Sequence, residues 1–126
     1  FLDMVYKLAE YEGQPKMKLS TDKSTLPGRK QVYRQMANGL AAHDIIGLWE
    51  EEHDGVPLLV KVMEGGRRIT KPDSIQACRA RRQTALNNLP KTLMELSPAQ
   101  PGYSVSISAR LMQLQQEARH HILQAE

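Results

Sequence analysis

Basic side chains are concentrated in the stretch KMKLSTDKSTLPGRKQVYR, residues 16–34, which holds six Lys or Arg residues and one acid, Asp22. Ammonium and guanidinium groups gathered in this way are strong donors to phosphate or pyrophosphate oxygens. Lysines also protect edge strands from pairing with other chains, so a solvated basic edge is the alternative. The same feature therefore has two interpretations, a phosphate-binding surface and a solubilising one.

Seven basic residues of this part of the chain come from elements that could fold together: Lys7, Lys16, Lys18, Lys23, Arg29, Lys30 and Arg34. Lys7 lies in a strand that we expect over residues 4–11, and Lys18 lies in the segment expected to return as the second arm of a hairpin. Between them, Gly13 tolerates positive φ in a turn and Pro15 is expected to end the ladder. If the two arms pair, Lys7 and Lys18 project into one cationic surface.

The histidines do not form a pattern that indicates catalysis or metal binding. His120 and His121 are adjacent, so on a helix their side chains point about 100° apart, whereas a zinc-binding pair needs the i, i+4 spacing. His43 and His53 each precede an aspartate beside an expected strand, but no nucleophile is suggested near either pair. We therefore assign no catalytic residue and no metal site.

Cys78 and Trp49 are both expected to be buried. Cys78 falls on the apolar stripe of an expected helix, where a small hydrophobic side chain is the default interpretation. Trp49 belongs to an apolar hairpin, and with 5% aromatic residues the chain gives little support to nucleic-acid binding by base stacking. Neither a Walker-type phosphate loop nor a G-x-G-x-x-G motif occurs.

Length and composition describe an ordinary domain. The chain has 126 residues, 40% of them hydrophobic, and a net charge of +3, which suits one domain with a core and a mild preference for anions. A single cysteine excludes an internal disulfide and fits a reducing compartment. No apolar run approaches the roughly 20 residues that cross a membrane.

The first half of the chain is rich in expected strands. A short strand is expected over residues 31–36, after a Pro27-Gly28 turn. The clearest expected hairpin pairs residues 43–52 with residues 56–64 around an Asp54-Gly55 turn, and apolar residues on both of its faces indicate that it is well covered. A Gly65-Gly66 turn and a short edge strand follow.

The second half changes to a helical period. One helix is expected from an N-cap at Asp73 to a stop at Pro90, and a second begins among Ser104, Ser106 and Ser108. The apolar stripe of the first contains Ile75, Cys78, Ala85 and Leu89, and that of the second contains Ile107, Leu111, Leu114, Ala118 and Ile122. Strands followed by helices predict an α+β fold, with small antiparallel hairpins in the N-terminal half and two helices in the C-terminal half.

Residues 2–34 resemble the distal segment of bacterial nicotinate phosphoribosyltransferases. The matching pattern is VYKL, then MKLS, a lysine, TLPGRKQV and an arginine. The later stretch GVPLLVKVMEGGRRIT, residues 55–70, is similar to the C-terminal domain of the same family. The resemblance implies that residues 1–40 are distal strands of a type II phosphoribosyltransferase sheet domain, and that residues 41–126 are the family's C-terminal domain.

The resemblance implies a parent enzyme of NAD salvage. Such an enzyme is a cytoplasmic homodimer that condenses nicotinate with phosphoribosyl pyrophosphate, coupled to hydrolysis of ATP with Mg²⁺, and yields nicotinate mononucleotide. By motif position, Lys7 of VYKL and Lys18 of MKLS would contact substrate phosphates. Lys30 and Arg34 match the motif without a role that the resemblance defines.

The resemblance also implies what this chain does not contain. In such a parent the α/β barrel, the catalytic histidine region and the nicotinate pocket precede Phe1. We therefore expect a fragment of an enzyme that binds no cofactor, is inactive by itself and packs against the missing barrel. The alternatives are a stand-alone basic module that binds nucleic acid, and a scaffold or regulatory domain.

Overall fold

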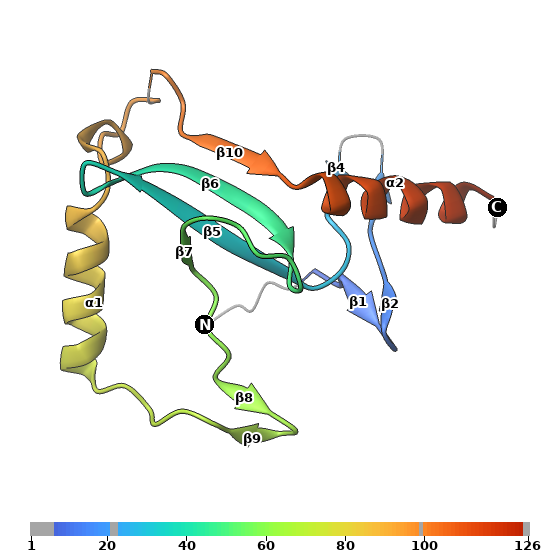
Figure 1. The fold of residues 1–126 in the computed structure, drawn as a ribbon, viewed down its shortest axis with the longest axis horizontal. Coiled ribbons are helices and arrows are strands. Elements are labelled where there is room, and N and C mark those ends of the chain that lie inside the picture. Colours follow the sequence, from blue (N-terminus) through green and yellow to red (C-terminus); the bar gives the residue numbers. More distant parts are fainter. Residues whose placement is uncertain (1–6, 21–22, 99, 125–126) are drawn as a thin grey trace. The chain divides into compact units, whose positions relative to one another are not determined.

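The computed structural model describes residues 7–20, 23–98 and 100–124. It has the α+β class expected from the sequence (Figure 1). The described part contains ten strands, two helices and one short 3-10 helix. In chain order they are β1 (Glu10–Tyr11), β2 (Gln14–Pro15), β3 (Leu19–Ser20), β4 (Lys23–Ser24), β5 (Lys30–Ala37), β6 (Leu40–Leu48), β7 (Val56–Pro57), β8 (Met63–Glu64), β9 (Arg67–Arg68), α1 (Ile75–Asn87), η1 (Lys91–Leu93), β10 (Ser104–Ile107) and α2 (Ala109–Gln124).

These strands form one four-stranded sheet and three two-stranded hairpins. The order in the larger sheet is β10-β6-β5-β7, and the hairpins are β1–β2, β3–β4 and β8–β9. The chain forms two compact units, each discontinuous in sequence. The described residues of the first come from 1–31, 46–53 and 107–126, and those of the second from 32–45 and 54–106. The expected division at residue 40 stays a prediction.

The long hairpin of the sheet is β5–β6, joined at Asn38-Gly39 (Figure 1). Both turn residues have positive φ, 52° for Asn38 and 79° for Gly39, which matches the twist of the strands that the turn connects. The expected strand at residues 31–36 is thus confirmed and slightly longer. The expected hairpin between residues 43–52 and 56–64 is wrong, because the first of these arms pairs with β5 instead.

Gly55 has a different role from the one expected for it. Its φ is +118°, and a Cβ at this position would lie 2.6 Å from the carbonyl oxygen of Arg34. The glycine therefore lets residues 54–57 approach β5, where Val56 pairs with Arg34 and Pro57 with Tyr33. The Asp54-Gly55 motif therefore marks the point where the chain comes close to β5, and it is not the turn of a hairpin.

The β1–β2 hairpin turns at residues Glu12 and Gly13, both with positive φ, as the EGQP pattern indicates. Strand β2 ends at Pro15, as expected, and this last residue of the strand pairs with Glu10. The next pair outward is hydrogen-bonded, with the amide of Lys16 donating to Ala9 (N···O 2.9 Å). Pairs alternate in an antiparallel ladder, so Pro15 occupies a position that needs no N–H. Residues 4–6 of the expected first strand lie outside the described residues.

Helix α2 is the packed helix of the first unit. Ser108 caps it, because its Oγ accepts from the amide of Leu111 (3.1 Å) and donates to Oε2 of Glu51 (2.7 Å). Leu111 is 0% exposed, and Leu114, Ala118 and Ile122 of the same stripe are half-buried, as expected. Ile107, also expected on this stripe, is instead the last residue of β10 and is exposed. Burial raises the pKa of Glu51, but hydrogen bonds from Ser108 and from the Leu48 amide outweigh it, so the pKa is lowered.

Helix α1 of the second unit is exposed along its length except at Leu86, which is half-buried. Ser74, and not the expected Asp73, is its N-cap, with Oγ accepting from the amide of Ala77 (3.1 Å). None of its residues is buried, and Ile75 is 68% exposed. The expectation that Cys78 is buried is therefore wrong, since it is a free, exposed thiol. Trp49, at 42% exposure, is also not a core residue.

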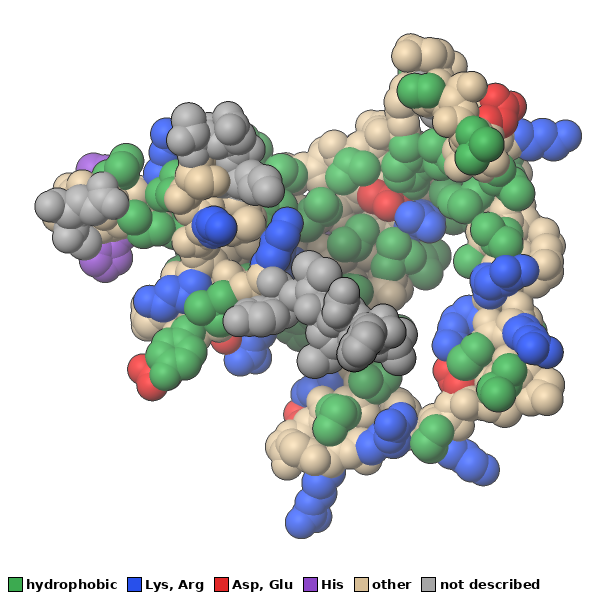
Figure 2. Space-filling view, turned by 180° about the vertical axis from the view of Figure 1, so that it is seen from behind, with side chains coloured by type: hydrophobic (Ala, Val, Ile, Leu, Met, Phe, Trp, Pro, Cys, Tyr) green, Lys and Arg blue, Asp and Glu red, His purple; other side chains and the backbone are tan. Residues whose placement is uncertain are grey.

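The exposure of α1 belongs to a longer exposed segment. Every residue from 54 to 85 is exposed, including Leu58, Leu59, Val60 and Val62 of the arm that was expected to be well covered. Figure 2 shows hydrophobic side chains on the surface among Lys and Arg. A 13-residue helix is marginal in water without a packed face. The segment at 54–85, which we call the exposed arm, therefore lacks the packing that normally stabilises such elements.

No helix in the part of the chain that the structure describes has both the length and the apolar character to span a membrane.

The two glycines with positive φ at positions 55 and 65 provide a matched test of this fold. Gly65→Ala has open space for the new Cβ, so we expect it to cost about 1 kcal/mol of backbone strain alone. Gly55→Ala adds a clash with the backbone of β5, and we expect a loss of about 3 kcal/mol or more. Thermal unfolding of the two purified variants measures the difference. Equal losses would show that β7 does not approach β5 as described.

Candidate phosphate-binding surface

Lys7 and Lys18 are both exposed and both lie just outside strands of the first unit. Lys7 precedes β1, and Lys18 precedes β3. The register of β1–β2, continued outward, would place them opposite each other. The backbone of Lys18 instead pairs with Thr25, whose Oγ1 accepts from the Lys18 amide (2.9 Å) and whose amide donates to the Lys18 carbonyl (3.4 Å). A shared surface for the two ammonium groups stays a prediction.

A hollow of about 430 Å³ lies beside Lys7. It is lined by Lys7, Leu8, Ala9, Thr25, Leu26 and Lys30. Two cations thus border one depression, but they differ in what their ammonium groups do. Lys7 is exposed, whereas Lys30 is half-buried.

The ammonium group of Lys30 is used within the fold. Its Nζ donates to the carbonyl oxygens of Leu26 (2.8 Å), Pro27 (3.3 Å) and Gly28 (2.6 Å). Burial lowers the pKa of Lys30. An ammonium has three protons and three carbonyls receive them, so Lys30 stabilises the Pro27-Gly28 turn and has no proton left for a phosphate.

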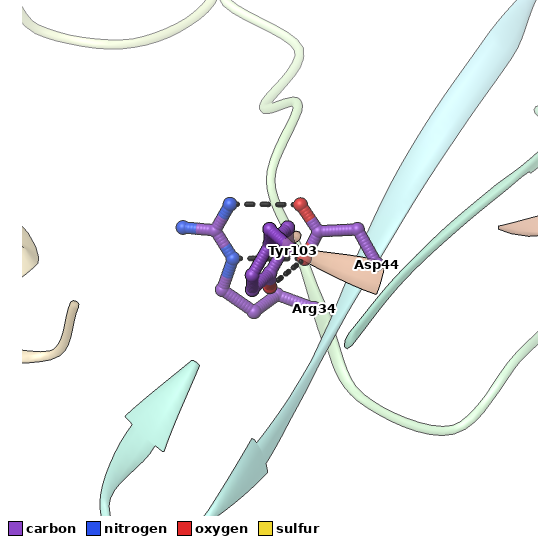
Figure 3. Close-up of polar contacts among 3 residues, drawn as sticks. All are labelled: Arg34, Asp44 and Tyr103. Carbon is purple, nitrogen blue, oxygen red and sulfur yellow. Dashed lines mark hydrogen bonds and ion pairs between the residues drawn. The ribbon is translucent and has the colours of Figure 1, made fainter. Parts of the chain in front are cut away.

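Arg34 is also used within the fold, in a cluster of the second unit (Figure 3). Its Nε and Nη2 donate to Oδ1 and Oδ2 of Asp44 at 2.9 and 2.8 Å, a bidentate pair between β5 and β6. The hydroxyl of Tyr103 donates to Oδ1 of the same carboxylate (2.8 Å), and the guanidinium carbon lies 5.9 Å from the centre of the Tyr103 ring. Asp44, only 7% exposed, thereby receives three charge-assisted hydrogen bonds.

The contacts of this cluster lower the pKa of Asp44 and raise the pKa values of Arg34 and Tyr103. Hydrogen bonds from Arg34 and Tyr103 hold the pKa of Asp44 below its usual value, although burial acts against them. The hydrogen bond to Asp44 raises the pKa of Arg34. Burial and the bond to Asp44 raise the pKa of Tyr103. At neutral pH the cluster is a partly buried ion pair with a neutral tyrosine donor, which is a structural arrangement.

The basic stretch therefore divides into engaged and available cations. Arg29 pairs with Glu10 at the surface (2.9 Å), and Lys30 and Arg34 have the partners given above. Within the described ranges no ion pair includes Lys7, Lys16 or Lys18, all of which are exposed. These three lysines are the candidates for an external anion, while the side chain of Lys23 lies outside the description.

The histidines do not build a metal centre. Residues 7–20, 23–98 and 100–124 contain no group of three His, Cys, Asp or Glu placed to hold a metal ion. His43 does contact two hydroxyls that sequence reasoning missed, with Nδ1 2.8 Å from Ser104 Oγ and Nε2 2.9 Å from Ser106 Oγ. Alternation on β10 points both serines to one face, which was the available signal.

The comparisons with known proteins decide the family. Residues 51–115, slightly more than half of the chain, match the family model described as "Nicotinate phosphoribosyltransferase C-terminal domain". The chain belongs to this family.

Longer relatives agree with this family. The chain is 36% identical over 120 residues to a nicotinate phosphoribosyltransferase of Mycobacterium tuberculosis, and this alignment covers 94% of this chain and 26% of that protein. A nicotinate phosphoribosyltransferase of Dictyostelium discoideum is 44% identical over 55 residues, 42% of this chain and 9% of that protein. The crystal structure of the human nicotinic acid phosphoribosyltransferase matches with a TM-score of 0.75 and 27% identity, over 90% of this chain and 26% of that one.

As a nicotinate phosphoribosyltransferase C-terminal domain, the chain spans about a quarter of the length of the Mycobacterium and human relatives. The family model begins at Glu51, so the basic stretch lies outside it. The alignment with the Mycobacterium protein covers so much of the chain that it includes residues 16–34. The resemblance of the basic stretch to this family, expected from the motif, is thus confirmed at the level of the family and not of individual residues.

The Arg34–Asp44–Tyr103 cluster leads to a prediction about acid sensitivity. The pKa of Asp44 is lower when folded than when unfolded, so its contribution is present above about pH 4 and is lost as pH falls through the folded value. Tyr103→Phe removes one donor to the carboxylate, and we expect a loss of about 1 kcal/mol at pH 7 that shrinks below pH 4. Chemical unfolding at several pH values measures it.

Two further variants calibrate that measurement. Arg34→Met leaves the Asp44 charge without its main partner, so a larger loss of about 3 kcal/mol is expected. Tyr11→Phe changes an exposed tyrosine and is expected to be neutral at every pH. A Tyr103→Phe loss that stays constant down to pH 3 would contradict the cluster as the source of the effect.

Proposed function

We propose that this chain is the C-terminal part of a nicotinate phosphoribosyltransferase that condenses nicotinate with phosphoribosyl pyrophosphate to give nicotinate mononucleotide and pyrophosphate. The observation that carries the proposal is 36% identity to a protein of that name over 94% of this chain. The fold likeness to the human enzyme, at a TM-score of 0.75, supports it. The role in cytoplasmic NAD salvage follows from the same reaction.

The chain contributes binding and packing surface to this reaction, and the chemistry belongs to the rest of the parent. Coupling to ATP with Mg²⁺ is part of the proposal, and we assign it to the remaining polypeptide. The described residues gather no His, Cys, Asp or Glu cluster that could hold the metal. Their buried carboxylates are already engaged, Asp44 by Arg34 and Glu51 by Ser108.

Lys7 and Lys18 are the proposed contacts to substrate phosphates. Three neighbouring cations, Arg29, Lys30 and Arg34, are satisfied by the chain itself, whereas Lys7 and Lys18 present exposed ammonium groups from the same unit. An exposed ammonium on a short ordered segment is a strong point donor to a pyrophosphate oxygen. In a homodimer of the parent, these lysines would serve the active site at the subunit boundary.

The exposed arm is the proposed packing surface for the missing barrel. It carries exposed apolar side chains, and it lies entirely within the segment that the family model matches. It also has seven basic against three acidic residues. A partner surface that is apolar with an acidic rim would complement it, and the remaining three quarters of the parent is the occupant that this proposal names.

The phosphate role is tested in the full-length protein that contains this chain. Lys7→Ala and Lys18→Ala each remove a charge-assisted hydrogen bond, so we expect KM for phosphoribosyl pyrophosphate to rise about tenfold. KM for nicotinate should change less than twofold. Lys91→Ala, an exposed lysine outside the basic stretch, is the matched control and should behave like the wild type. Unchanged KM values for both variants would remove the phosphate role.

A second test asks whether the 126-residue chain is active without the rest of the parent. The 126-residue chain, purified and supplied with nicotinate, phosphoribosyl pyrophosphate and MgATP, should form no nicotinate mononucleotide above background. The full-length protein in the same assay is the positive control, and chromatographic detection of the product is the measurement. Turnover by the chain alone would mean that catalytic groups lie within these residues.

A further inference from the structure

The loop at residues 25–28 is bonded to both segments that carry the proposed phosphate lysines. On one side, the amide of Gly28 donates to the carbonyl oxygen of Ala9 (2.7 Å), two residues after Lys7. On the other side, Thr25 exchanges hydrogen bonds with the backbone of Lys18. Any shift of this loop therefore moves the backbone next to both lysines.

Lys30 holds this loop from within the first unit. Its ammonium donates to the carbonyl oxygens of Leu26, Pro27 and Gly28. These three residues are consecutive in sequence, so their carbonyls must converge on one point to accept from the same group. Three adjacent carbonyl dipoles turned toward each other repel, and a positive charge at their centre offsets that repulsion. The conformation of the loop thus depends on the cation.

The other side of the loop is fixed by packing. Pro27 is fully buried, and a Cβ on Gly28 would lie 3.0 Å from Cδ2 of Leu114 and 3.4 Å from Cδ2 of Leu48. Gly28 has a φ of +75°, which other residues seldom adopt. The loop is therefore held between the apolar face of α2 and the ammonium of Lys30.

We propose that Lys30 is a positioning residue for phosphate binding, which holds the loop at residues 25–28 and through it orients Lys7 and Lys18. This inference rests on the proposed function. It assigns Lys30 an indirect role, because its three protons are used by carbonyls although it lines the same hollow as Lys7. The substrate group that it serves is the pyrophosphate of the sugar donor.

The first experiment compares two substitutions of Lys30 in the full-length protein. Lys30→Met keeps the length of the side chain and removes its charge, so KM for phosphoribosyl pyrophosphate should rise about five- to tenfold. The kcat and the KM for nicotinate should stay within twofold. Lys30→Arg keeps the charge, but a planar guanidinium cannot converge on three successive carbonyls, so it should not restore KM. Restoration by arginine would indicate a direct electrostatic role and overturn the proposal.

The second experiment asks whether Lys30 acts through the two lysines. In a Lys7→Ala, Lys18→Ala background, Lys30→Met should produce no further rise in KM, because residues in one pathway are not additive. An equal rise in both backgrounds, or no rise in the wild-type background, would overturn the proposal. If the lysine variants alone leave KM unchanged, the proposed phosphate role fails and this inference fails with it. If Lys7→Ala and Lys18→Ala raise KM for phosphoribosyl pyrophosphate and Lys30→Met does not, the phosphate role stands and only this inference fails.

A milder pair of variants covers the case in which Lys30→Met does not fold. Thr25→Val removes the acceptor for the Lys18 amide and keeps the shape of the side chain, whereas Thr25→Ser keeps the hydroxyl. We expect Thr25→Val to raise KM for phosphoribosyl pyrophosphate about threefold, and only when Lys18 is present. Thr25→Ser should match the wild type. Identical behaviour of the two variants would contradict a loop that positions Lys18.

Discussion

A basic side chain that leaves water must have acceptors around it, and this requirement organises the ordered parts of the chain. Lys30 is surrounded by three carbonyls, and Arg34 by a carboxylate and the ring of Tyr103. Burying either cation without partners would cost several kcal/mol. Lys30 therefore fixes the Pro27-Gly28 turn in the first unit, and the Arg34–Asp44 pair fixes Tyr103 in the second. The same requirement explains why Lys30 and Arg34 of the basic stretch are engaged within the chain.

The sequence predicted the fold class and several local elements because these depend on neighbours along the chain. The turns at Gly13 and at Gly65-Gly66, the strand β5 and the stripe of α2 all come from short-range patterns. The choice between two hairpin turns was wrong, because Asn38-Gly39 and Asp54-Gly55 are equally good local signals. What separates them is the approach of Gly55 to β5, a contact between residues about 20 apart in sequence.

The site shows the same limit. The candidates Lys7 and Lys18 were named by motif position from the family resemblance, and their exposure agrees with that role without testing it. Sequence could not assign Lys30 or Arg34, because their partners are backbone carbonyls in one case and Asp44 and the distant Tyr103 in the other. Burial of Cys78 was predicted from periodicity, which identifies an apolar face but not whether this chain covers it. On α1 nothing within the described part of the chain does so.

His43 on β6 contacts the hydroxyls of Ser104 and Ser106 on β10, and these two hydrogen bonds must run in opposite senses. A neutral imidazole has one N–H and one lone pair, so one serine hydroxyl donates a hydrogen bond to the ring while the other accepts one from it. Moving the ring proton to the other nitrogen reverses both hydroxyls together. The orientation of two surface hydroxyls on β10 is therefore set by a single proton on β6.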